Sequence, residues 1–283
     1  MQIRPANACL GAEIDGLDLA APLTDATFRE VRDALHTHHV LAFRAQRLTA
    51  TAFLDFARRF AVPEPHVLDQ FHHSAHPEIL ILSNVRENGQ PTGLADGGTY
   101  WHSDYSYLEI PARATLLYSI TVPRVGGDTL FADQEKAYAD LPEAMRTRID
   151  GLVGLHLYGN RDDLDEQSRL VAFPLSEAQK EKRSITVIRH PIVRQHPFTR
   201  RKALYAVSGT SIGIEGMPDG EALALLRELA AFSTRPAYQL RVEYGVGDVV
   251  MWDNASVLHS ATLTHPDDPR TLWRITTKEV ERP

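Results

Sequence analysis

The sequence has little cysteine and no long hydrophobic run. Cys9 is the single cysteine among 283 residues, so an internal disulfide and a thiolate metal site are both excluded. No apolar run approaches the about 18 residues of a membrane-spanning helix. The N-terminus also lacks the charged-then-apolar layout of a secretory signal. These features predict a cytoplasmic protein that does not enter a membrane.

An excess of basic residues is also missing. The chain contains 30 Lys and Arg residues against 37 Asp and Glu residues, for a formal net charge of -7 at pH 7. Such a chain is not expected to bind a nucleic-acid backbone. Its composition, 43% hydrophobic and 24% charged, is typical of globular proteins. Without repeats or a Ser/Gly-rich linker, we expect one domain over residues 1–283, with a homo-oligomer left open.

Apolar residues follow helical spacing in two segments near the N-terminus. Thr27 and Glu30 have the form of a capping box, and a second helical pattern runs from Phe53 to Phe60. From residue 78 onward, short apolar runs separated by Gly- and Asp-containing turns predict strands. The predicted strands are 79–82, 115–122, 129–132, 152–158, 185–188, 203–208, 238–244, 249–252 and 273–280, with another at 40–43 and a helix at about 219–232.

Many short strands with few helices between them predict an α+β, β-rich fold with a sandwich or jelly-roll core. The charged segment 161–183 is long for a loop in a compact domain. We expect it to be a lid or a surface excursion.

Histidine is abundant, at 13 residues, and three of them stand two positions before an acidic residue. The patterns at 76–78 and 265–267 each contain a proline, which favours a loop or an unshared face over a metal site. His102 and Asp104 lie instead in an aromatic segment without Pro or Gly. In an extended segment, residues i and i+2 point to the same face. The two side chains therefore project toward one ion, or else form a surface pair beside core aromatics.

A third ligand is expected from a distant part of the chain, because jelly-roll strands that are far apart in sequence meet in space. His259 is the candidate, since it follows the apolar strand at 249–252 and a turn at 253–254. The alternative for this residue is an ordinary buried histidine.

Two arginines follow this histidine. Arg270 and Arg274 are four residues apart, and in a strand they would share a face. Together they could bind a carboxylate or a sulfonate. Taken singly, each arginine is better explained as a surface residue paired with Glu279 or Glu281.

These residues belong to an ordered set of short motifs. The set comprises WHSD at 101–104, GGDT at 126–129, GD at 247–248, MWDN at 251–254, His259, and the arginines at 270 and 274. In this order and at these separations, the motifs resemble those of the TauD/TfdA family of iron(II)- and 2-oxoglutarate-dependent dioxygenases. The resemblance runs over most of the chain.

The resemblance implies a double-stranded β-helix core with flanking helices, and a reaction that hydroxylates a substrate with release of succinate and CO2. It implies that His102, Asp104 and His259 bind Fe(II), a ligand set found in non-haem iron oxygenases. Thr129 and Arg270 would bind the distal carboxylate of the co-substrate 2-oxoglutarate, while O2 takes the remaining position. An aspartate at position 104 favours hydroxylation, since related halogenases carry a small residue there.

The prime substrate is expected to be small and anionic: a sulfonate, an aryloxyalkanoate or another organic acid. Arg274 matches the family arginine that holds the sulfonate in the taurine enzyme. A substrate-binding histidine is expected at His72 or His73, of which we take His73. Tyr105 and Tyr107 stand where the taurine enzyme has smaller or less polar side chains. They favour an aromatic or hydrogen-bonding substrate.

Two other classes of protein remain open at this point. A jelly-roll zinc hydrolase or isomerase could use the same three ligands, although it would need neither Thr129 nor Arg270. A non-catalytic binding protein of the same fold would need none of the metal ligands.

Overall fold

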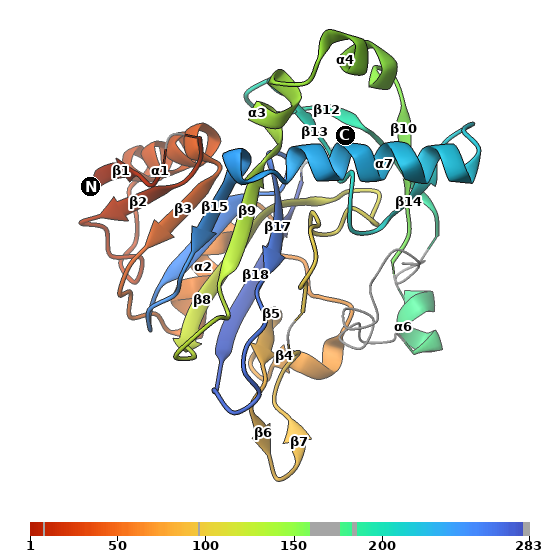
Figure 1. Cartoon of the computed structure of the whole chain (residues 1–283). Helices are drawn as coiled ribbons and strands as arrows, with labels where there is room; N and C mark the ends of the chain where they lie inside the picture. The colour runs from red at the N-terminus through yellow and green to blue at the C-terminus, as the bar shows by residue number, and fades with distance from the viewer. Residues whose placement is uncertain (8, 96, 159–175, 183–185, 280–283) are drawn as a thin grey trace.

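The computed structural model describes residues 1–283 except 8, 96, 159–175, 183–185 and 280–283 (Figure 1). Its helices are α1 (Asp25–His38), α2 (Ala50–Arg58), α3 (Gln134–Ala139), α4 (Glu143–Ile149), α6 (Glu177–Lys182) and α7 (Asp219–Ser233), with 3-10 turns η1 (Asp69–Phe71) and η2 (Pro236–Tyr238). The strands of the first half are β1 (Gln2–Pro5), β2 (Ala12–Asp15), β3 (Val40–Phe43), β4 (His72–His73), β5 (His76–Ser83), β6 (Arg86–Glu87), β7 (Gln90–Pro91), β8 (Ala112–Thr121) and β9 (Thr129–Asp133). Those of the second half are β10 (Val153–His156), β11 (Ile188–Pro191), β12 (Val193–Gln195), β13 (Lys202–Leu204), β14 (Ser211–Ile214), β15 (Gln239–Val242), β16 (Val249–Asp253), β17 (Val257–Ala261) and β18 (Thr271–Lys278).

Two sheets form the centre of the molecule. The larger has the order β1-β2-β3-β16-β8-β18-β5-β4, and the smaller has the order β15-β9-β17. Neighbouring strands are far apart in sequence, as β16 pairs with both β3 and β8. Side chains from both sheets share one hydrophobic cluster, with Leu117 and Val250 from the larger sheet and Phe131 from the smaller. The predicted β-rich jelly-roll core is confirmed.

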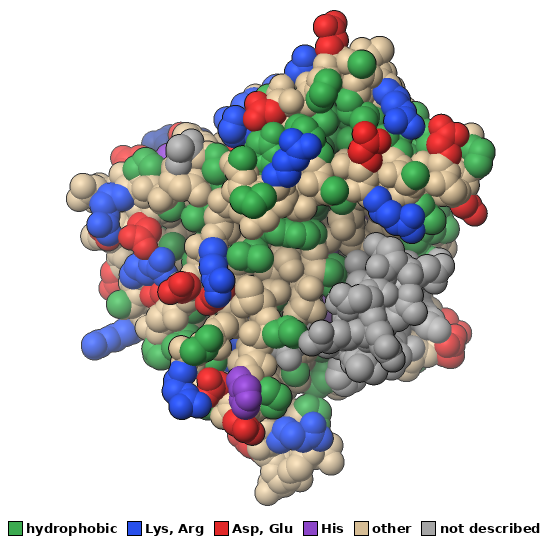
Figure 2. All heavy atoms as spheres, viewed as in Figure 1, with side chains coloured by type: hydrophobic (Ala, Val, Ile, Leu, Met, Phe, Trp, Pro, Cys, Tyr) green, Lys and Arg blue, Asp and Glu red, His purple; other side chains and the backbone are tan. Residues whose placement is uncertain are grey.

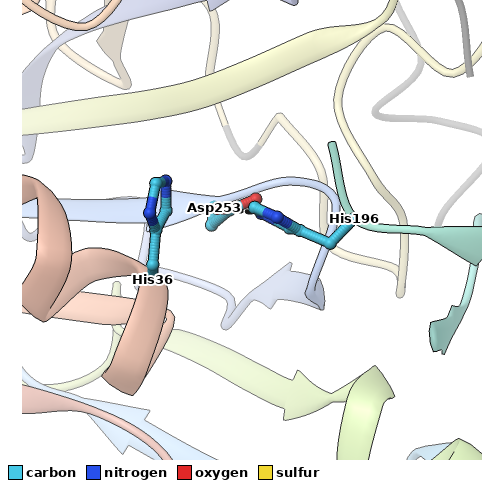
Figure 3. Close-up of side chains that lie close together, drawn as sticks. All are labelled: His36, His196 and Asp253. Atoms are coloured by element: carbon cyan, nitrogen blue, oxygen red, sulfur yellow. Dashed lines mark hydrogen bonds and ion pairs between the residues drawn. The ribbon is translucent and has the colours of Figure 1, made fainter. Parts of the chain in front are cut away.

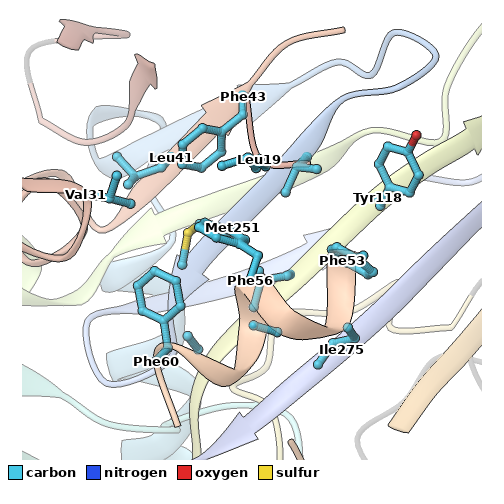
Figure 4. Packing of buried hydrophobic residues seen from close by; sticks show 14 of the residues in the cluster. Leu19, Val31, Leu41, Phe43, Phe53, Phe56, Phe60, Tyr118, Met251 and Ile275 are labelled. Carbon is cyan, nitrogen blue, oxygen red and sulfur yellow. The ribbon is translucent and has the colours of Figure 1, made fainter. Parts of the chain in front are cut away.

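The outer face of the larger sheet is covered by helices. Phe53 and Phe56 of α2 pack in a second cluster with Met251 and Ile275 from the strands beneath (Figure 4). This packing follows from the spacing of apolar residues along α2, which places them on one helix face. The two hydrophobic layers fix the sheet from both sides.

The first helix begins earlier than the sequence predicted. The Oγ1 atom of Thr24 accepts a hydrogen bond from the backbone N–H of Thr27 at 3.1 Å, so Thr24 is the N-cap of α1. Thr27 therefore lies inside the first turn and does not form the capping box predicted with Glu30. Both threonines suit an N-cap, and the sequence alone did not separate them.

Other boundaries differ in similar ways. The run 203–208 is a strand only over Lys202–Leu204, and the strand predicted at 185–188 begins at Ile188, with residue 185 outside the described chain. The sequence did not predict β1, β2, α3 or α4. These elements are short, so their periodicity is weak.

A third cluster lies beneath α7, where Leu225 and Leu229 pack with Ile214 of β14. Acidic and basic side chains are interspersed over the face of the molecule drawn in Figure 2. Among the described helices, none combines the length and apolar character that crossing a membrane requires.

Most of the segment 161–183, predicted as a lid, lies outside the described residues. Its described part is Ser176 and α6, where the Gln179 side chain donates hydrogen bonds to Asp69 and Gln70, each at 3.0 Å.

Candidate active site

The two predicted histidine ligands face each other across a backbone bridge. The N–H of His102 donates to the carbonyl of His259 at 3.0 Å, and the N–H of His259 donates to the carbonyl of His102 at 2.9 Å. His259 belongs to β17, so the bridge attaches the segment of His102 to the smaller sheet. The imidazole ring centroids lie 4.1 Å apart.

Asp104 completes this group. It lies in a turn and not in the extended segment that the sequence predicted, yet its carboxylate reaches both rings. Its Oδ1 is 3.5 Å from Nε2 of His102, and its Oδ2 is 3.7 Å from Nε2 of His259. One ligand atom from each of the three side chains lies within 4.8 Å of the others. The structure therefore brings the three predicted ligands together.

The ring of His102 is held by its other nitrogen and by two glycines. Nδ1 lies 2.7 Å from the carbonyl oxygen of Tyr100, to which it donates as an N–H, leaving the lone pair of Nε2 for a ligand. Gly98 and Gly209 both have positive φ, and a Cβ on either would come within 2.7 Å of the His102 side chain. Only glycine fits this close approach.

Asp104 is held by neighbouring polar side chains. The Thr115 hydroxyl donates to Oδ2 at 2.6 Å. Asn254 accepts a hydrogen bond from the Asp104 backbone N–H at 3.2 Å and donates one to the Thr115 hydroxyl at 3.0 Å. The Nη2 of Arg274 lies 2.7 Å from Oδ1. Outer contacts of this kind orient a ligating carboxylate.

Charges in this group favour the deprotonated forms that bind metal. Burial opposes ionisation of Asp104, but the Arg274 guanidinium and the two histidines hold the pKa of this carboxyl well below its usual range. Burial and the proximity of His102 lower the pKa of His259 well below its usual value. As a result, Asp104 is an ionised carboxylate beside the neutral imidazole of His259.

The donor set fits a divalent iron centre. Two imidazole nitrogens and one carboxylate converge from buried or partly buried side chains. This is the two-histidine, one-carboxylate set of non-haem Fe(II) oxygenases, which leaves coordination positions for other ligands.

A separate polar group surrounds Thr129 and Arg270. The Thr129 hydroxyl lies 2.8 Å from the hydroxyl of Tyr244. The Nε of Arg270 donates to the carbonyl of Gly127 at 3.2 Å, and a Cβ at Gly127 would lie 2.8 Å from that Nε. Burial raises the pKa of Tyr244 to about 12, with Thr129 and Arg270 opposing the rise. A buried cation and two hydroxyls thus lie close together and suit a carboxylate.

The sequence did not single out Tyr244. It follows β15 in a segment without regular structure, and nothing in its spacing distinguishes it from an ordinary aromatic residue. Asn254 and Thr115 received no role either, although Asn254 lies within the MWDN motif, and that motif was the available signal.

Arg274 is surrounded by aromatic side chains. Its guanidinium carbon is 5.8 Å from the ring centroid of Tyr105, and Tyr105, Tyr107 and Tyr100 all favour its charged form. The ring centroid of Tyr107 lies 6.0 Å from that of Tyr105 and 4.8 Å from that of Tyr158. A cation among tyrosines next to the metal ligands suits an anion that carries an aromatic group.

His73 is placed differently from the expectation. Its ring packs edge-on to Trp273, with centroids 5.3 Å apart, and lies 5.7 Å from the ring of His76. His76 in turn contacts Thr51 of α2, so His73 lies on the helix-covered face of the sheet. Trp273 and Arg274 are consecutive in β18 and point to opposite faces. The structure therefore does not bring His73, the predicted substrate-binding histidine, to the side of Arg274.

His72 lies on the other side. Its Nε2 is 2.8 Å from the carbonyl oxygen of His66, and the His66 ring centroid is 6.0 Å from that of Tyr105. The register of β4 against β5 shifts between His72 and His73. This irregularity explains why the sequence could not assign the two histidines to faces.

The pattern at 265–267 behaves as predicted for a loop. His265 and Asp267 are 3.8 Å apart, with 66% and 88% of their side-chain surface exposed.

The sequence matches the family described as "Taurine catabolism dioxygenase TauD, TfdA family" over residues 2–276. It is 32% identical to the alpha-ketoglutarate-dependent 2,4-dichlorophenoxyacetate dioxygenase of Burkholderia sp. (strain RASC), over 94% of this chain and 90% of that protein. It is 30% identical to the (S)-phenoxypropionate/alpha-ketoglutarate-dioxygenase of Sphingobium herbicidovorans, over 96% of this chain and 92% of that protein. The structure is similar to that of AAD-2 in complex with Mn(II) and N-oxalylglycine, with a TM-score of 0.81, 29% identity and coverage of 99% and 98%.

Proposed function

This chain belongs to the TauD/TfdA family of dioxygenases, and on that basis we propose that it hydroxylates a small anionic substrate with an aromatic group, of the aryloxyalkanoate class. It is an Fe(II)- and 2-oxoglutarate-dependent dioxygenase. The observation that carries the proposal is the position of Arg274, 2.7 Å from the metal-ligand carboxylate of Asp104 and among tyrosines. The comparisons give no support to a zinc hydrolase or to a non-catalytic protein.

In this proposal, His102, Asp104 and His259 hold the iron. When bound, ferrous iron supplies the dioxygen chemistry, in which 2-oxoglutarate and O2 become succinate, CO2 and one oxygen atom for the prime substrate. Thr115 and Asn254 keep the Asp104 carboxylate oriented toward both imidazoles.

Arg270 and Thr129 bind the distal carboxylate of 2-oxoglutarate. The guanidinium provides the charge and the hydroxyl a hydrogen bond. Tyr244 fixes the Thr129 hydroxyl through a contact of 2.8 Å between the two hydroxyl oxygens.

Arg274 binds the carboxylate of the prime substrate, and the rings of Tyr105 and Tyr107 pack against its apolar part. In a substrate of the aryloxyacetate type, hydroxylation of the carbon beside the ether oxygen gives a hemiacetal. The hemiacetal breaks down to a phenol and an oxo acid, so a released phenol reports the reaction directly.

The test compares three compounds in the presence of Fe(II), 2-oxoglutarate and O2. Phenoxyacetate carries both the anion and the ring, 2-phenoxyethanol lacks the anion, and ethoxyacetate lacks the ring. We expect phenoxyacetate to give the most succinate, with phenol in equal amount. Equal succinate formation from 2-phenoxyethanol would contradict the role of Arg274, and equal formation from ethoxyacetate would contradict that of the tyrosines.

A further inference from the structure

A second group of potential metal ligands lies outside the proposed active site. His36 stands in the last turn of α1, His196 follows β12, and Asp253 ends β16. One ligand atom from each lies within 4.8 Å of the others. In Figure 3 the Asp253 carboxylate and the His196 ring point toward each other, and His36 rises from the end of α1 beside them.

The His196 and Asp253 side chains are held in fixed orientations. Nδ1 of His196 accepts hydrogen bonds from the backbone N–H groups of Phe198 and Thr199, at 3.1 and 3.0 Å. Its Nε2 therefore carries the proton and donates to Oδ2 of Asp253 at 2.9 Å. The other carboxylate oxygen accepts from the backbone N–H of Ala255 at 2.9 Å. Only Nε2 and Oδ2 remain to serve an ion.

His36 supplies the third donor. Its ring stacks on Phe198, with centroids 5.2 Å apart and planes at 16°, and meets the His196 ring at 73°. Within the described part of the chain, neither ring nitrogen of His36 makes a hydrogen bond. The three donors form a buried group, and His36 as a whole residue is partly exposed at the end of α1. The C-terminal turn of α1 carries partial negative charge, which favours a cation.

Two arginines near this group are engaged elsewhere. Arg201 pairs with Glu135 at 2.7 Å and donates to the carbonyl of His36. Arg113 lies 4.1 Å over the Phe198 ring and donates to the carbonyl of Phe60 at 2.8 Å. Their charges weaken cation binding, but both guanidinium groups are held by these other partners.

We propose that His36, His196 and Asp253 form a second divalent-metal site, of the kind that takes Zn2+. Two imidazoles and one carboxylate with a water in the fourth position are a common zinc coordination. The ion takes the place of the proton between Nε2 of His196 and Oδ2 of Asp253, and this proton leaves to solvent. The site is separate from the triad of His102, Asp104 and His259.

The test is a Co2+ titration of the metal-free full chain, followed by visible absorption. Four-coordinate Co2+ absorbs several-fold more strongly than six-coordinate Co2+, so the two sites differ in their bands. We expect two equivalents to bind to the wild type, and one in His102→Ala, with the strong band retained. His36→Ala should bind one equivalent and lose the strong band.

His38→Ala removes a neighbouring histidine of α1 that is not in the cluster, and it should behave as the wild type. His36→Gln keeps a side chain of similar size in case the alanine variant fails to fold. A wild type that binds one equivalent and shows no strong band would overturn the proposal. So would a folded His36 variant that still binds two. Neither result would bear on the 2-oxoglutarate reaction, which depends on the other triad.

Discussion

The hydroxyl of Thr115 donates a 2.6 Å hydrogen bond to Oδ2 of Asp104, deep between the two sheets where Thr115 is fully buried. The same hydroxyl accepts from Asn254, which also accepts from the Asp104 backbone. Asp104, whose carboxylate is proposed to bind iron, is therefore held by hydrogen bonds at both its side chain and its backbone. Its orientation does not depend on the ion alone.

Thr115→Val should weaken metal binding, because valine keeps the shape of threonine and removes the hydrogen bond to Asp104. Loss of an outer contact of this kind costs about tenfold to a hundredfold in metal affinity. Competition with a fluorescent chelator measures the dissociation constant for Fe(II) or Co2+. Thr121→Val, at the far end of β8, is the matched control and should bind as the wild type. Equal affinities for all three proteins would show that Thr115 does not orient the ligand.

Tyr244→Phe should weaken 2-oxoglutarate binding several-fold without changing the KM of the prime substrate. The phenylalanine keeps the packing but leaves the Thr129 hydroxyl without its 2.8 Å partner. Isothermal titration of the metal-loaded protein with 2-oxoglutarate, without O2, measures the effect directly. Tyr118→Phe removes a hydroxyl that contacts Gln46 and Leu48 instead, and should have no effect. A rise in the prime-substrate KM alone would place Tyr244 in the wrong subsite.

Arg274→Ala should raise the KM of the prime substrate much more than that of 2-oxoglutarate. The guanidinium is the cation closest to the metal ligands among the described residues, 2.7 Å from Asp104. Initial rates of succinate formation with each compound varied in turn measure the two constants. Metal affinity is measured in parallel, because the variant also removes a charge from Asp104. Equal effects on both constants would contradict the assigned division between Arg270 and Arg274.

The protonation of His156 should lower the stability of the folded protein in acid. Burial and the nearby His190 lower the pKa of His156 from its usual 6.5 to about 3. The unfolded chain therefore takes up this proton first, and its contribution to stability is complete above about pH 6.5. As the pH falls from there toward 3, stability should fall by about 1.4 kcal/mol per pH unit from this residue.

Urea unfolding of the wild type and of His156→Asn at several pH values isolates this effect. Asparagine retains a polar atom near Ser211, which contacts Nδ1 of His156 at 3.3 Å. The slope of the unfolding free energy against pH should be smaller in the variant, by the amount that corresponds to the uptake of about one proton on unfolding. Burial raises the pKa of Asp133 to about 6. This residue changes stability with pH in the opposite direction, and by the same amount in both proteins. His265→Asn, at an exposed site, should leave the slope unchanged; parallel curves for His156→Asn would refute the prediction.

The sequence predicts the centre of this site better than its surroundings. His102, Asp104 and His259 are found because metal chemistry restricts the residue types, and because the motifs keep a fixed order. Tyr244 and Thr115 contribute single hydroxyl groups whose value depends on a partner brought close by folding. No spacing along the chain encodes that proximity.

The histidines of β4 show a second limit. A residue's face follows from strand alternation only while the register is regular. The shift between His72 and His73 breaks this rule, and so the sequence could not show which of the two histidines faces Arg274. The start of α1 was missed for a simpler reason, because Thr24 and Thr27 are chemically equivalent caps.

The most direct test of the account uses the purified protein with Fe(II) and 2-oxoglutarate in the absence of O2. We predict a weak charge-transfer band in the visible spectrum, which shifts when phenoxyacetate is added and is absent in His102→Ala. Such a band requires 2-oxoglutarate to bind the iron, and its shift requires the prime substrate to bind beside it. A wild-type protein that gives no band, or a band that survives in His102→Ala, would contradict the assignment of His102, Asp104 and His259 as the iron site.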